Sequence, residues 1–534
     1  MSEPTGPAPE RLDDLLTAAA SRSPGAAAIA SPAGALTFAE LDSQVTRVAA
    51  GLRGWLGDDA AVVGIANTLD VSFAVALYAV VRAGYTALVL NPLHPGQMLA
   101  QAAGAAGAAA VIAPSQVLAA LADAPGRPTG LRELILADGL AGGEPTLASI
   151  ATADVTAWVP PSRGPRDIAL IQFTSGTTGR PKGVRLTHRN LVVNAAQVAR
   201  AHELGPSSVT LNHLPTLHPM HLNAAICAGA TQVLCPDPSS ARAVEMANTC
   251  RATHYYSLPV RLAQLAAAPD LAVLRFETVQ AVLSGGSALP GWAATALRAH
   301  FGVPVVQGYG LAEMSPLTHS DPPSRPAPGS VGPVVADTQC RVVGLTSRET
   351  LPAQARGEVQ VRGPQLMAGY LDPAEPSGVD AGGWLSTGDV GYLDDEGRLF
   401  LVDRIKDVFK CDNWMIAPSE VEAVLIGHPG VADCVVVELP DDFHGAVAGA
   451  AVVLRDGCTP GEVARWLRDR VPYYQCLHAV AVVGEVTRSP NGKVQRRQFR
   501  DLVAAAPRLT PAEPDAHDEE EARGNHDQPA HRDR

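Results

Sequence analysis

The chain of 534 residues is poor in aromatic side chains, in positive charge and in closely spaced cysteines. Aromatic residues make up only 4% of it, a scarcity that by itself says nothing about chemistry. The formal net charge of −13 argues against nucleic acid as a partner, because a phosphate backbone selects basic surfaces. Any anionic ligand must therefore be held by a local site.

The cysteines also lack the spacing of a metal site or a disulfide framework. Eight of them are scattered along the chain, and no two form a CxxC pair. This pattern is typical of free thiols in a reducing compartment. The first residues are polar and acidic and lack the apolar segment of a secretory signal. Together these features predict a cytoplasmic protein.

The sequence contains no clear membrane span either. Its most apolar window, residues 71–90, is interrupted by Arg82 and Gly84, so we expect a buried helix that runs into a strand. With 46% hydrophobic and 18% charged residues, the composition is that of a soluble globular protein. The length predicts two or more domains. We expect a monomer or a homodimer, and the length does not distinguish the two.

Local patterns predict an α/β fold. Strands alternate with helices along much of the chain, which favours mainly parallel sheets covered by helices. Thr37 and Glu40 have the spacing of a helix capping box. The Ala-rich residues 101–110 predict a helix, and residues 111–113 a short strand. Residues 357–372 are expected to form a pair of strands.

The most informative stretch is TSGTTGRPKG, residues 174–183, which follows an apolar strand predicted at residues 168–173. Glycines leave backbone N–H groups open to an anion, hydroxyl side chains donate hydrogen bonds, and a lysine adds positive charge. The string therefore predicts a polyphosphate-binding loop, although a short GTTG alone is typical of a flexible surface loop. It is not a Walker loop, because neither Ser nor Thr follows Lys182. The predicted phosphate contacts are Thr174, Ser175, Gly176, Thr177, Thr178, Gly179 and Lys182.

Three further motifs follow in order. VQAVLSGGSALP and VPVVQGYGLAEMSP each run from a predicted strand into glycines, a weak signal that usually marks a tight turn. STGD ends in Asp389, whose carboxylate can accept hydrogen bonds from two ribose hydroxyls, and Arg404 can add another contact. The alternative for both charges is a solvated turn.

This ordered series resembles the adenylate-forming superfamily of acyl-CoA synthetases, aryl-CoA ligases, stand-alone adenylation enzymes and luciferases. The resemblance covers roughly residues 10–503. It implies a large N-terminal domain at residues 9–404, built of helix-covered, mainly parallel sheets with a small β-rich subdomain. A small mobile α+β domain at residues 405–506 would follow, with Lys406 as the hinge. Residues 507–534 are charged and lack core residues, so we expect them to be disordered.

The resemblance also implies roles for individual residues. Glu313 corresponds to the Mg²⁺ ligand, and Lys493 in RSPNGK to the catalytic lysine, acting with Lys182. Tyr309 would stack on adenine. The positions expected around the adenine and phosphates are Gly285, Gly286, Ser287, Gln307, Gly308, Tyr309, Gly310 and Leu311. The positions expected to line the acid pocket are His218, Met220, Gly286 and Gly310.

The chain departs from the family pattern at two places. Most relatives have Thr where Ala312 stands, and the lost hydroxyl would remove about 1–2 kcal/mol of contact with the α-phosphate. Asp412 and Asn413 replace a basic–Gly pair in a segment that CoA-using relatives bring to the active site. An acidic residue there puts the handling of pantetheine in doubt more than adenylation.

The implied reaction is attack of a carboxylate on the α-phosphate of ATP, which forms an acyl-adenylate and pyrophosphate. The acyl group would then pass to coenzyme A, or alternatively to the phosphopantetheine arm of a carrier protein; an inactive nucleotide-binding regulator is a third possibility. By the resemblance, an α-amino acid is disfavoured, because relatives that activate amino acids usually hold the α-amine with an Asp near the position of His218, and TLHPMHLN contains none. A hydrophobic alkyl or aryl acid fits better. His213, His218 and His221 invite a metal interpretation, but packing beneath a pocket is favoured because no carboxylate or cysteine accompanies them.

Overall fold

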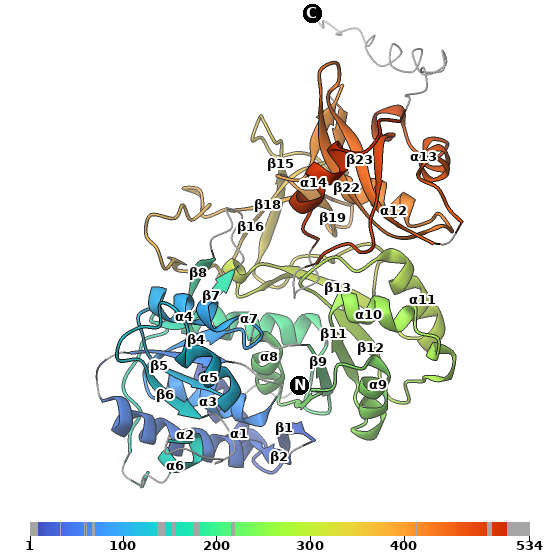
Figure 1. Ribbon diagram of the computed structural model, residues 1–534. Coiled ribbons are helices and arrows are strands. Elements are labelled where there is room, and N and C mark those ends of the chain that lie inside the picture. Colours follow the sequence, from blue (N-terminus) through green and yellow to red (C-terminus); the bar gives the residue numbers. More distant parts are fainter. Residues whose placement is uncertain are drawn as a thin grey trace, which may run out of the picture. The chain divides into compact units, whose positions relative to one another are not determined.

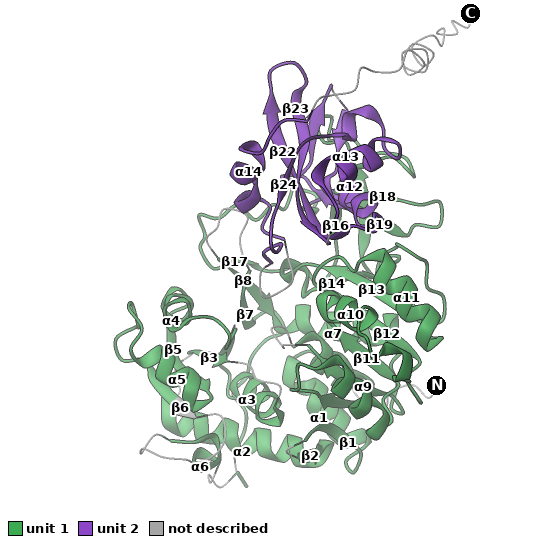
Figure 2. Cartoon of the chain, turned by 45° about the vertical axis from the view of Figure 1, so that its right-hand side comes forward, with its two compact units in different colours: residues 1–387, 391–401 green, residues 388–390, 402–534 purple. Residues whose placement is uncertain are grey.

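The computed structural model describes residues 9–32, 34–57, 59, 61–66, 70–135, 145–151, 155–156, 158–174, 181–214, 219–412, 414–455, 457–488 and 494–509 (Figure 1). The chain divides into two compact units (Figure 2). Unit 1 comprises residues 1–387 and 391–401, and unit 2 comprises residues 388–390 and 402–534.

One sheet of unit 1 has seven strands in the order β17-β8-β7-β4-β3-β5-β6. The strands from β7 to β6 run parallel to their neighbours, whereas β8 is antiparallel to both β7 and β17. The parallel strands are almost continuously apolar, as expected when both faces of a sheet are covered. In sheet order the seven strands span Gly369–Tyr370, Lys182–Thr187, Ile168–Thr174, Thr86–Leu90, Val62–Ala66, Ala108–Ala113 and Arg132–Ile135.

The second sheet of unit 1 has eight strands in the order β14-β13-β12-β11-β9-β10-β1-β2. Its two edge strands, β14 and β2, are antiparallel to their neighbours, and the strands between them are parallel. In sheet order the strands span Leu317–Ser320, Val305–Gly310, Ala281–Ser284, His254–Ser257, Val209–His213, Thr231–Leu234, Ala27–Ser31 and Gly34–Thr37.

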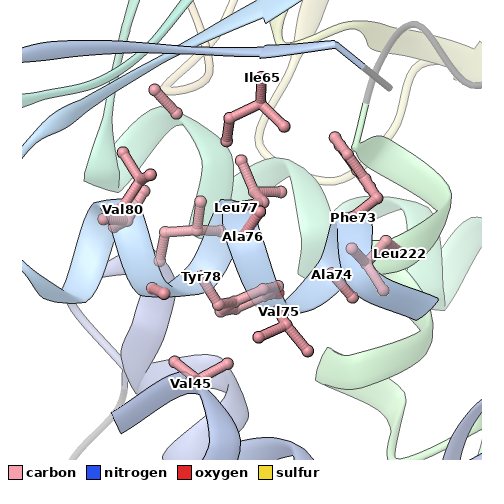
Figure 3. Close-up of a cluster of buried hydrophobic side chains, with 14 of the residues drawn as sticks. Val45, Ile65, Phe73, Ala74, Val75, Ala76, Leu77, Tyr78, Val80 and Leu222 are labelled. Carbon is pink, nitrogen blue, oxygen red and sulfur yellow. The ribbon is translucent and has the colours of Figure 1, made fainter. Parts of the chain in front are cut away.

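Helices cover these sheets, and one helix that is buried along most of its length lies in the core. This helix, α3 (Val71–Arg82), packs between Val45, Ile65 and Leu222 (Figure 3). Its one charged residue, Arg82, is buried and is held by Asp42 at 2.7 Å. The other helices of the unit are α1 (Leu12–Arg22), α2 (Phe38–Leu56), α4 (Gly96–Ala105), α5 (Ser115–Ala122), α6 (Leu147–Ile150), α7 (His188–Ala201), α8 (Met220–Ala228), α9 (Ser240–Thr249), α10 (Pro259–Ala266) and α11 (Gly291–Phe301), with 3₁₀ turns at Leu271–Val273 and Ala312–Met314.

A smaller four-stranded sheet has the order β15-β16-β18-β19, and its last two strands carry the chain from unit 1 to unit 2. These strands span Gln339–Val343, Gly357–Arg362, Leu385–Leu393 and Leu399–Arg404. The sheet provides the predicted β-rich subdomain.

Unit 2 is built on a long antiparallel pair, β22 (Val431–Asp441) and β23 (Gly445–Leu454). Five strands form its sheet, in the order β21-β20-β23-β22 with β24 beside β23. Consecutive valines and alanines of the central pair are buried on both faces and form its core with the helices. The remaining elements are β20 (Phe409–Cys411), β21 (Trp414–Ile416), β24 (Leu477–Val482), α12 (Pro418–Leu425), α13 (Pro460–Arg468), α14 (Arg497–Ala504) and a 3₁₀ turn at Tyr473–Gln475.

Two sequence-based expectations about local structure are wrong. The Ala-rich helix ends at Ala105, and Ala108 already belongs to β5, because Gly107 turns the chain at φ +63° and β5 pairs with β3. Residues 357–372 do not form a strand pair, since β16 and β17 belong to different sheets. In the described part of the chain, no helix is long and apolar enough to cross a bilayer.

The fold class is as predicted, while the domain limits stay a prediction. Division after residue 404 differs from the compact units in that residues 388–390 and 402–404 go with unit 2. Residues 510–534, most of the tail predicted to be disordered, lie outside the described residues.

Candidate nucleotide-binding site

The two ends of the predicted phosphate loop are held together by an antiparallel strand pair. Between β7 and β8, Thr174 lies opposite Lys182 and Phe173 lies opposite Gly183. A Cβ atom at Gly183 would come 3.0 Å from the side chain of Leu371, so a larger residue would push Leu371 aside. The five remaining predicted loop contacts lie outside the described residues: Ser175, Gly176, Thr177, Thr178 and Gly179.

Lys182 is engaged on two sides. Its Nζ lies 2.7 Å from Oε2 of Glu375 and 5.1 Å from the centre of the Tyr370 ring. Both side chains of the ion pair are largely shielded from solvent, which strengthens the attraction relative to an exposed pair. The cation predicted for phosphate therefore has a carboxylate partner in this structure.

Glu313 is held by Tyr370 of the short strand β17 and by Met367 just before that strand. The hydroxyl of Tyr370 in β17 donates to Oε1 of Glu313 at 2.8 Å, and the backbone N–H of Met367 donates to the carbonyl of Glu313. Burial, together with the nearby Glu313 carboxylate, raises the pKa of Tyr370, so its hydroxyl keeps its proton. β17 thus connects Lys182 with Glu313, whose hard oxygen donors suit Mg²⁺.

Tyr370 is a site residue that the sequence motifs did not single out. It lies in AGYLD, whose single glycine and single aspartate do not form a motif that points to a nucleotide. Its position follows from the antiparallel pairing of β17 with β8, where Tyr370 lies opposite Val184. Only this long-range pairing brings it to Lys182.

The two glycine-rich strand ends lie side by side. β12 and β13 are parallel neighbours with Ser284 opposite Gln307, so their carboxyl ends meet at one edge of the sheet. A Cβ atom at Gly285 would lie 3.6 Å from the carbonyl oxygen of Gly308, in ordinary contact. Oε1 of Gln307 accepts a hydrogen bond from the backbone N–H of Leu289 at 2.6 Å. The structure thus brings together the predicted residues 285–287 and 307–311.

Backbone packing explains the glycine that ends β13. A Cβ atom at Gly310 would lie 2.0 Å from the carbonyl oxygen of Pro316, and Leu311 donates its N–H to that same oxygen at 3.0 Å. Between the glycines, Tyr309 is half-buried, with its ring centre 5.8 Å from that of His319. Gly286 has φ +92°, a conformation that favours glycine.

The two predicted ribose contacts are paired within unit 2. Asp389 is 7% exposed, and its Oδ1 lies 3.3 Å from Nε of Arg404. The backbone N–H of Ile405 donates to the carbonyl of Gly388, which keeps this end of β19 beside β18. The pairing orients the Asp389 carboxylate, as a hydrogen-bond acceptor for hydroxyls requires. Lys406, the predicted hinge, is exposed in the turn that follows.

Lys493 and the preceding residues 489–492 lie outside the described residues, but the chain on either side is firmly anchored. Arg488 and Val494 form a β-bridge, and Nη2 of Arg488 lies 2.9 Å from Oδ1 of Asp433. Nη2 of Arg496 lies 3.0 Å from Oε2 of Glu422. Burial raises the pKa of Glu422, against the effect of the Arg496 guanidinium. Both ends of the lysine loop are thus tied to β22 and α12.

Near the predicted acid pocket, the structure describes His213 and His221 but not His218. His218 lies outside the described residues, and Met220 is half-buried at the start of α8. The ring nitrogens of His213 lie 3.0 Å from the Tyr255 hydroxyl and 2.9 Å from the Asp237 carbonyl. Burial lowers the pKa of His213 to about 4. These contacts fit packing rather than metal binding.

Comparisons with known proteins give the chain its relatives. The AMP-binding enzyme family profile matches residues 16–371, and that of the AMP-binding enzyme C-terminal domain matches residues 420–493. The chain is 30% identical over 491 residues to 4-coumarate–CoA ligase 5 of Oryza sativa subsp. japonica, over 88% of this chain and 90% of that protein. Among solved structures, ATP-bound MatB from Rhodopseudomonas palustris is 25% identical with a TM-score of 0.83, over 93% of this chain and 99% of that one. The amide bond synthetase McbA from Marinactinospora thermotolerans is 27% identical with a TM-score of 0.81, over 92% and 99%.

Proposed function

Because this chain belongs to the AMP-binding enzyme family, we propose that it activates a hydrophobic carboxylic acid with ATP and transfers the acyl group to coenzyme A. The chain is an enzyme of the AMP-forming acid–thiol ligase type. The observation that carries the proposal is the connection of Lys182, Tyr370 and Glu313 at the described end of the TSGTTGRPKG loop.

In the first half-reaction, a carboxylate oxygen of the acid attacks the α-phosphorus of ATP. The bond between the α-phosphorus and the bridging oxygen breaks, pyrophosphate leaves, and an acyl-adenylate remains. No protein nucleophile is needed, so the residues contribute by positioning two anions and by neutralising charge as it develops. Lys182 and the loop N–H groups serve the phosphates, and Lys493 is the group expected to contact the transition state.

Glu313 is the residue that would hold Mg²⁺. Its carboxylate is fixed by Tyr370 and lies in the same network as Lys182, a setting that suits a hard cation beside polyphosphate. When bound, the cation would neutralise phosphate charge. Tyr370 keeps the carboxylate oriented while its own hydroxyl remains protonated.

The nucleoside contacts follow from the glycine-rich strand ends and the acidic strand. Residues 285–287 and 307–311 would approach adenine, with Tyr309 as the stacking ring. Asp389, oriented by Arg404, would accept hydrogen bonds from the ribose hydroxyls. Ala312 offers no hydroxyl to the α-phosphate, so backbone and Lys182 contacts would carry that part of the site.

In the second half-reaction, the thiol sulfur of coenzyme A attacks the acyl carbonyl carbon, the bond from that carbon to the phosphate oxygen breaks, AMP leaves, and the thiol proton is released to solvent. One observation favours a second candidate, a carrier-protein phosphopantetheine as the thiol. Asp412 presents a partly exposed carboxylate at φ +49° in the segment that follows the proposed hinge. A carboxylate repels the several phosphates of coenzyme A more than the single phosphate of a pantetheine arm.

The proposed acid is an aryl or alkyl carboxylate. The rice relative is named for 4-coumarate, an aryl acid. Met220 contacts the hydrophobic cluster of Ala224 and Leu317, which makes this end of α8 apolar. His218, Met220, Gly286 and Gly310 remain the proposed lining of the acid pocket. A single methylene in such a pocket changes selectivity only ~10–200-fold.

The test is pyrophosphate release with ATP and Mg²⁺ across aryl, alkyl and amino acids, each with and without coenzyme A. We expect turnover with an aryl or alkyl acid that coenzyme A stimulates. Acid-dependent release that coenzyme A leaves unchanged would favour the carrier-protein alternative. Tyr370→Phe should raise the Mg²⁺ concentration needed for half-maximal activity, because the Glu313 carboxylate loses its hydrogen bond. Tyr392→Phe, a matched exchange in β18, should leave that concentration unchanged. ATP binding without turnover on any of these acids would contradict the proposed substrate class.

A further inference from the structure

Unit 2 contains a cluster of three different metal-ligating side chains that the nucleotide chemistry does not use. Cys411, Asp412 and His444 each offer one ligand atom, and these atoms all lie within 4.8 Å of one another. Both carboxylate oxygens of Asp412 lie 2.9 Å from Nδ1 of His444. The thiol, carboxylate and imidazole thus converge on a single point of the unit.

Backbone hydrogen bonds fix the two turns that carry these residues. At the end of β20, Cys411 pairs with Gly445 of β23, and the N–H of Asp412 donates to the carbonyl of His444 at 3.2 Å. Oδ1 of Asp441 accepts from the N–H groups of Phe443 and His444, at 3.0 and 3.1 Å. The positions of the ligating residues are therefore set before any ligand binds.

The conformation of Asp412 adds a second observation. Its φ of +49° lies in the left-handed region, which few residues other than glycine, asparagine and aspartate adopt. This conformation coincides with the approach of both Asp412 oxygens to His444.

The burial pattern suits a cation that enters from solvent. Cys411 is 2% exposed, whereas the side chains of Asp412 and His444 are 31% and 40% exposed. A thiolate and a carboxylate together bring two negative charges, which balance one divalent cation. Sulfur, nitrogen and oxygen donors from three residues are the ligand set of a zinc site that keeps one coordination position open.

We propose that Cys411, Asp412 and His444 bind a divalent cation of the zinc type. The cation would join the turn between β20 and β21 to the turn between β22 and β23. All three proposed ligands lie within unit 2, so the proposal is tested by metal binding and by stability and not by ligase activity.

Cobalt(II) is the probe of choice, since a thiolate bound to it gives a near-ultraviolet charge-transfer absorption. Residues 507–534 contain histidines and carboxylates but no cysteine, so background binding there cannot produce this band. Titration of the full chain with Co²⁺ should give the band at one equivalent, and added Zn²⁺ should remove it. Cys411→Ser should abolish the band, whereas Cys458→Ser, a matched exchange in the same unit, should retain it.

Two further variants keep the proposal testable if Cys411→Ser fails to fold. Asp412→Asn and His444→Ala change partly exposed side chains, and each should weaken Zn²⁺ binding by at least ~100-fold, measured by competition with a chelating dye. Zn²⁺ should raise the Tm of the native chain, and neither variant should show that rise. Absence of a sulfur band in the native chain, or unchanged Zn²⁺ affinity in both variants, would overturn the proposal.

Discussion

Lys182 carries a countercharge before any nucleotide is bound. Glu375 holds its ammonium at 2.7 Å, and Tyr370 lies against it on another side. If Lys182 binds phosphate as proposed, the phosphate must displace Glu375, so part of the attraction between lysine and nucleotide is offset by the loss of the internal pair. Glu375 is then an internal competitor for the nucleotide.

Glu375→Gln should therefore strengthen ATP binding. The partly buried pair contributes about 1 kcal/mol, which corresponds to roughly fivefold in Kd. Calorimetric titration with Mg-ATP in the absence of acid measures the effect. Glu396→Gln, which breaks an exposed pair with Arg325, serves as the control. Weaker ATP binding in Glu375→Gln would show that Glu375 supports the nucleotide instead of competing with it.

Lys493→Ala should lower the first half-reaction selectively. Loss of one preorganised charge at a developing anion typically costs 10²- to 10³-fold in rate, ~3–4 kcal/mol. ATP–pyrophosphate exchange measures the first step, and thioester formation from synthetic acyl-adenylate measures the second. Lys410→Ala, an exposed lysine of the same unit, is the control. Equal loss of both steps would contradict a role confined to adenylation.

At the scale of elements, the end of β13 packs so closely against the backbone of Pro316 that there is no room for a side chain at Gly310. Gly310→Ala would place a Cβ atom on the Pro316 carbonyl, so the strand and its neighbour β14 must move apart. We expect a loss of ~1–3 kcal/mol in the free energy of unfolding, with weaker ATP binding. Gly285→Ala, where a Cβ atom meets only ordinary contact, should fold normally. Urea unfolding compares the two, and equal stability would contradict the packing argument.

Sequence reasoning succeeded where the signal is local. The capping box of Thr37 and Glu40 forms as predicted, and residues 71–90 form the expected buried helix that runs into a strand, α3 followed by β4. The family and the fold class are confirmed as well. Each motif that carried the resemblance is a short local string, and the strings follow one another in the expected order. Lys493, His218 and most of the phosphate loop remain predictions.

It failed where long-range pairing decides. β5 begins inside the Ala-rich stretch because a parallel neighbour accepts it, although alanine favours a helix. β16 and β17 are nearby in the chain yet join different sheets. Because β17 pairs with β8, Tyr370 lies next to Lys182. Neither pairing leaves a trace in local composition, which is why Tyr370 was missed.

At the scale of the whole molecule, unit 1 buries several neutral histidines. Burial lowers the pKa of His188 and His213 to about 4, and that of His202 and His319 to about 3, from an ordinary value of 6.5. His202 has its Nδ1 3.0 Å from the hydroxyl of Tyr256. Burial therefore favours the uncharged form of each ring in the folded protein.

Unit 1 should therefore lose stability as the pH falls below 6.5. The unfolded histidines bind protons near pH 6.5 while the folded ones do not, so the stabilisation is full above that value and declines toward pH 4. Each such histidine contributes a slope of about 1.4 kcal/mol per pH unit. Urea unfolding between pH 7 and pH 5 measures the slope, and His202→Asn should reduce it by one histidine's share. A stability independent of pH over this range would contradict the assignment.

The pairing of Lys182 with Glu375 has a consequence for the safety of a reactive product. Acyl-adenylates acylate free amines, and the only lysines of this chain are Lys182, Lys406, Lys410 and Lys493. Every other cationic side chain of the Lys/Arg type is arginine, whose guanidinium stays protonated and is a poor nucleophile. With Lys182 held by Glu375 in the free chain and, as proposed, by phosphate once nucleotide is bound, an enzyme that makes such an intermediate offers it few amines on which to damage itself.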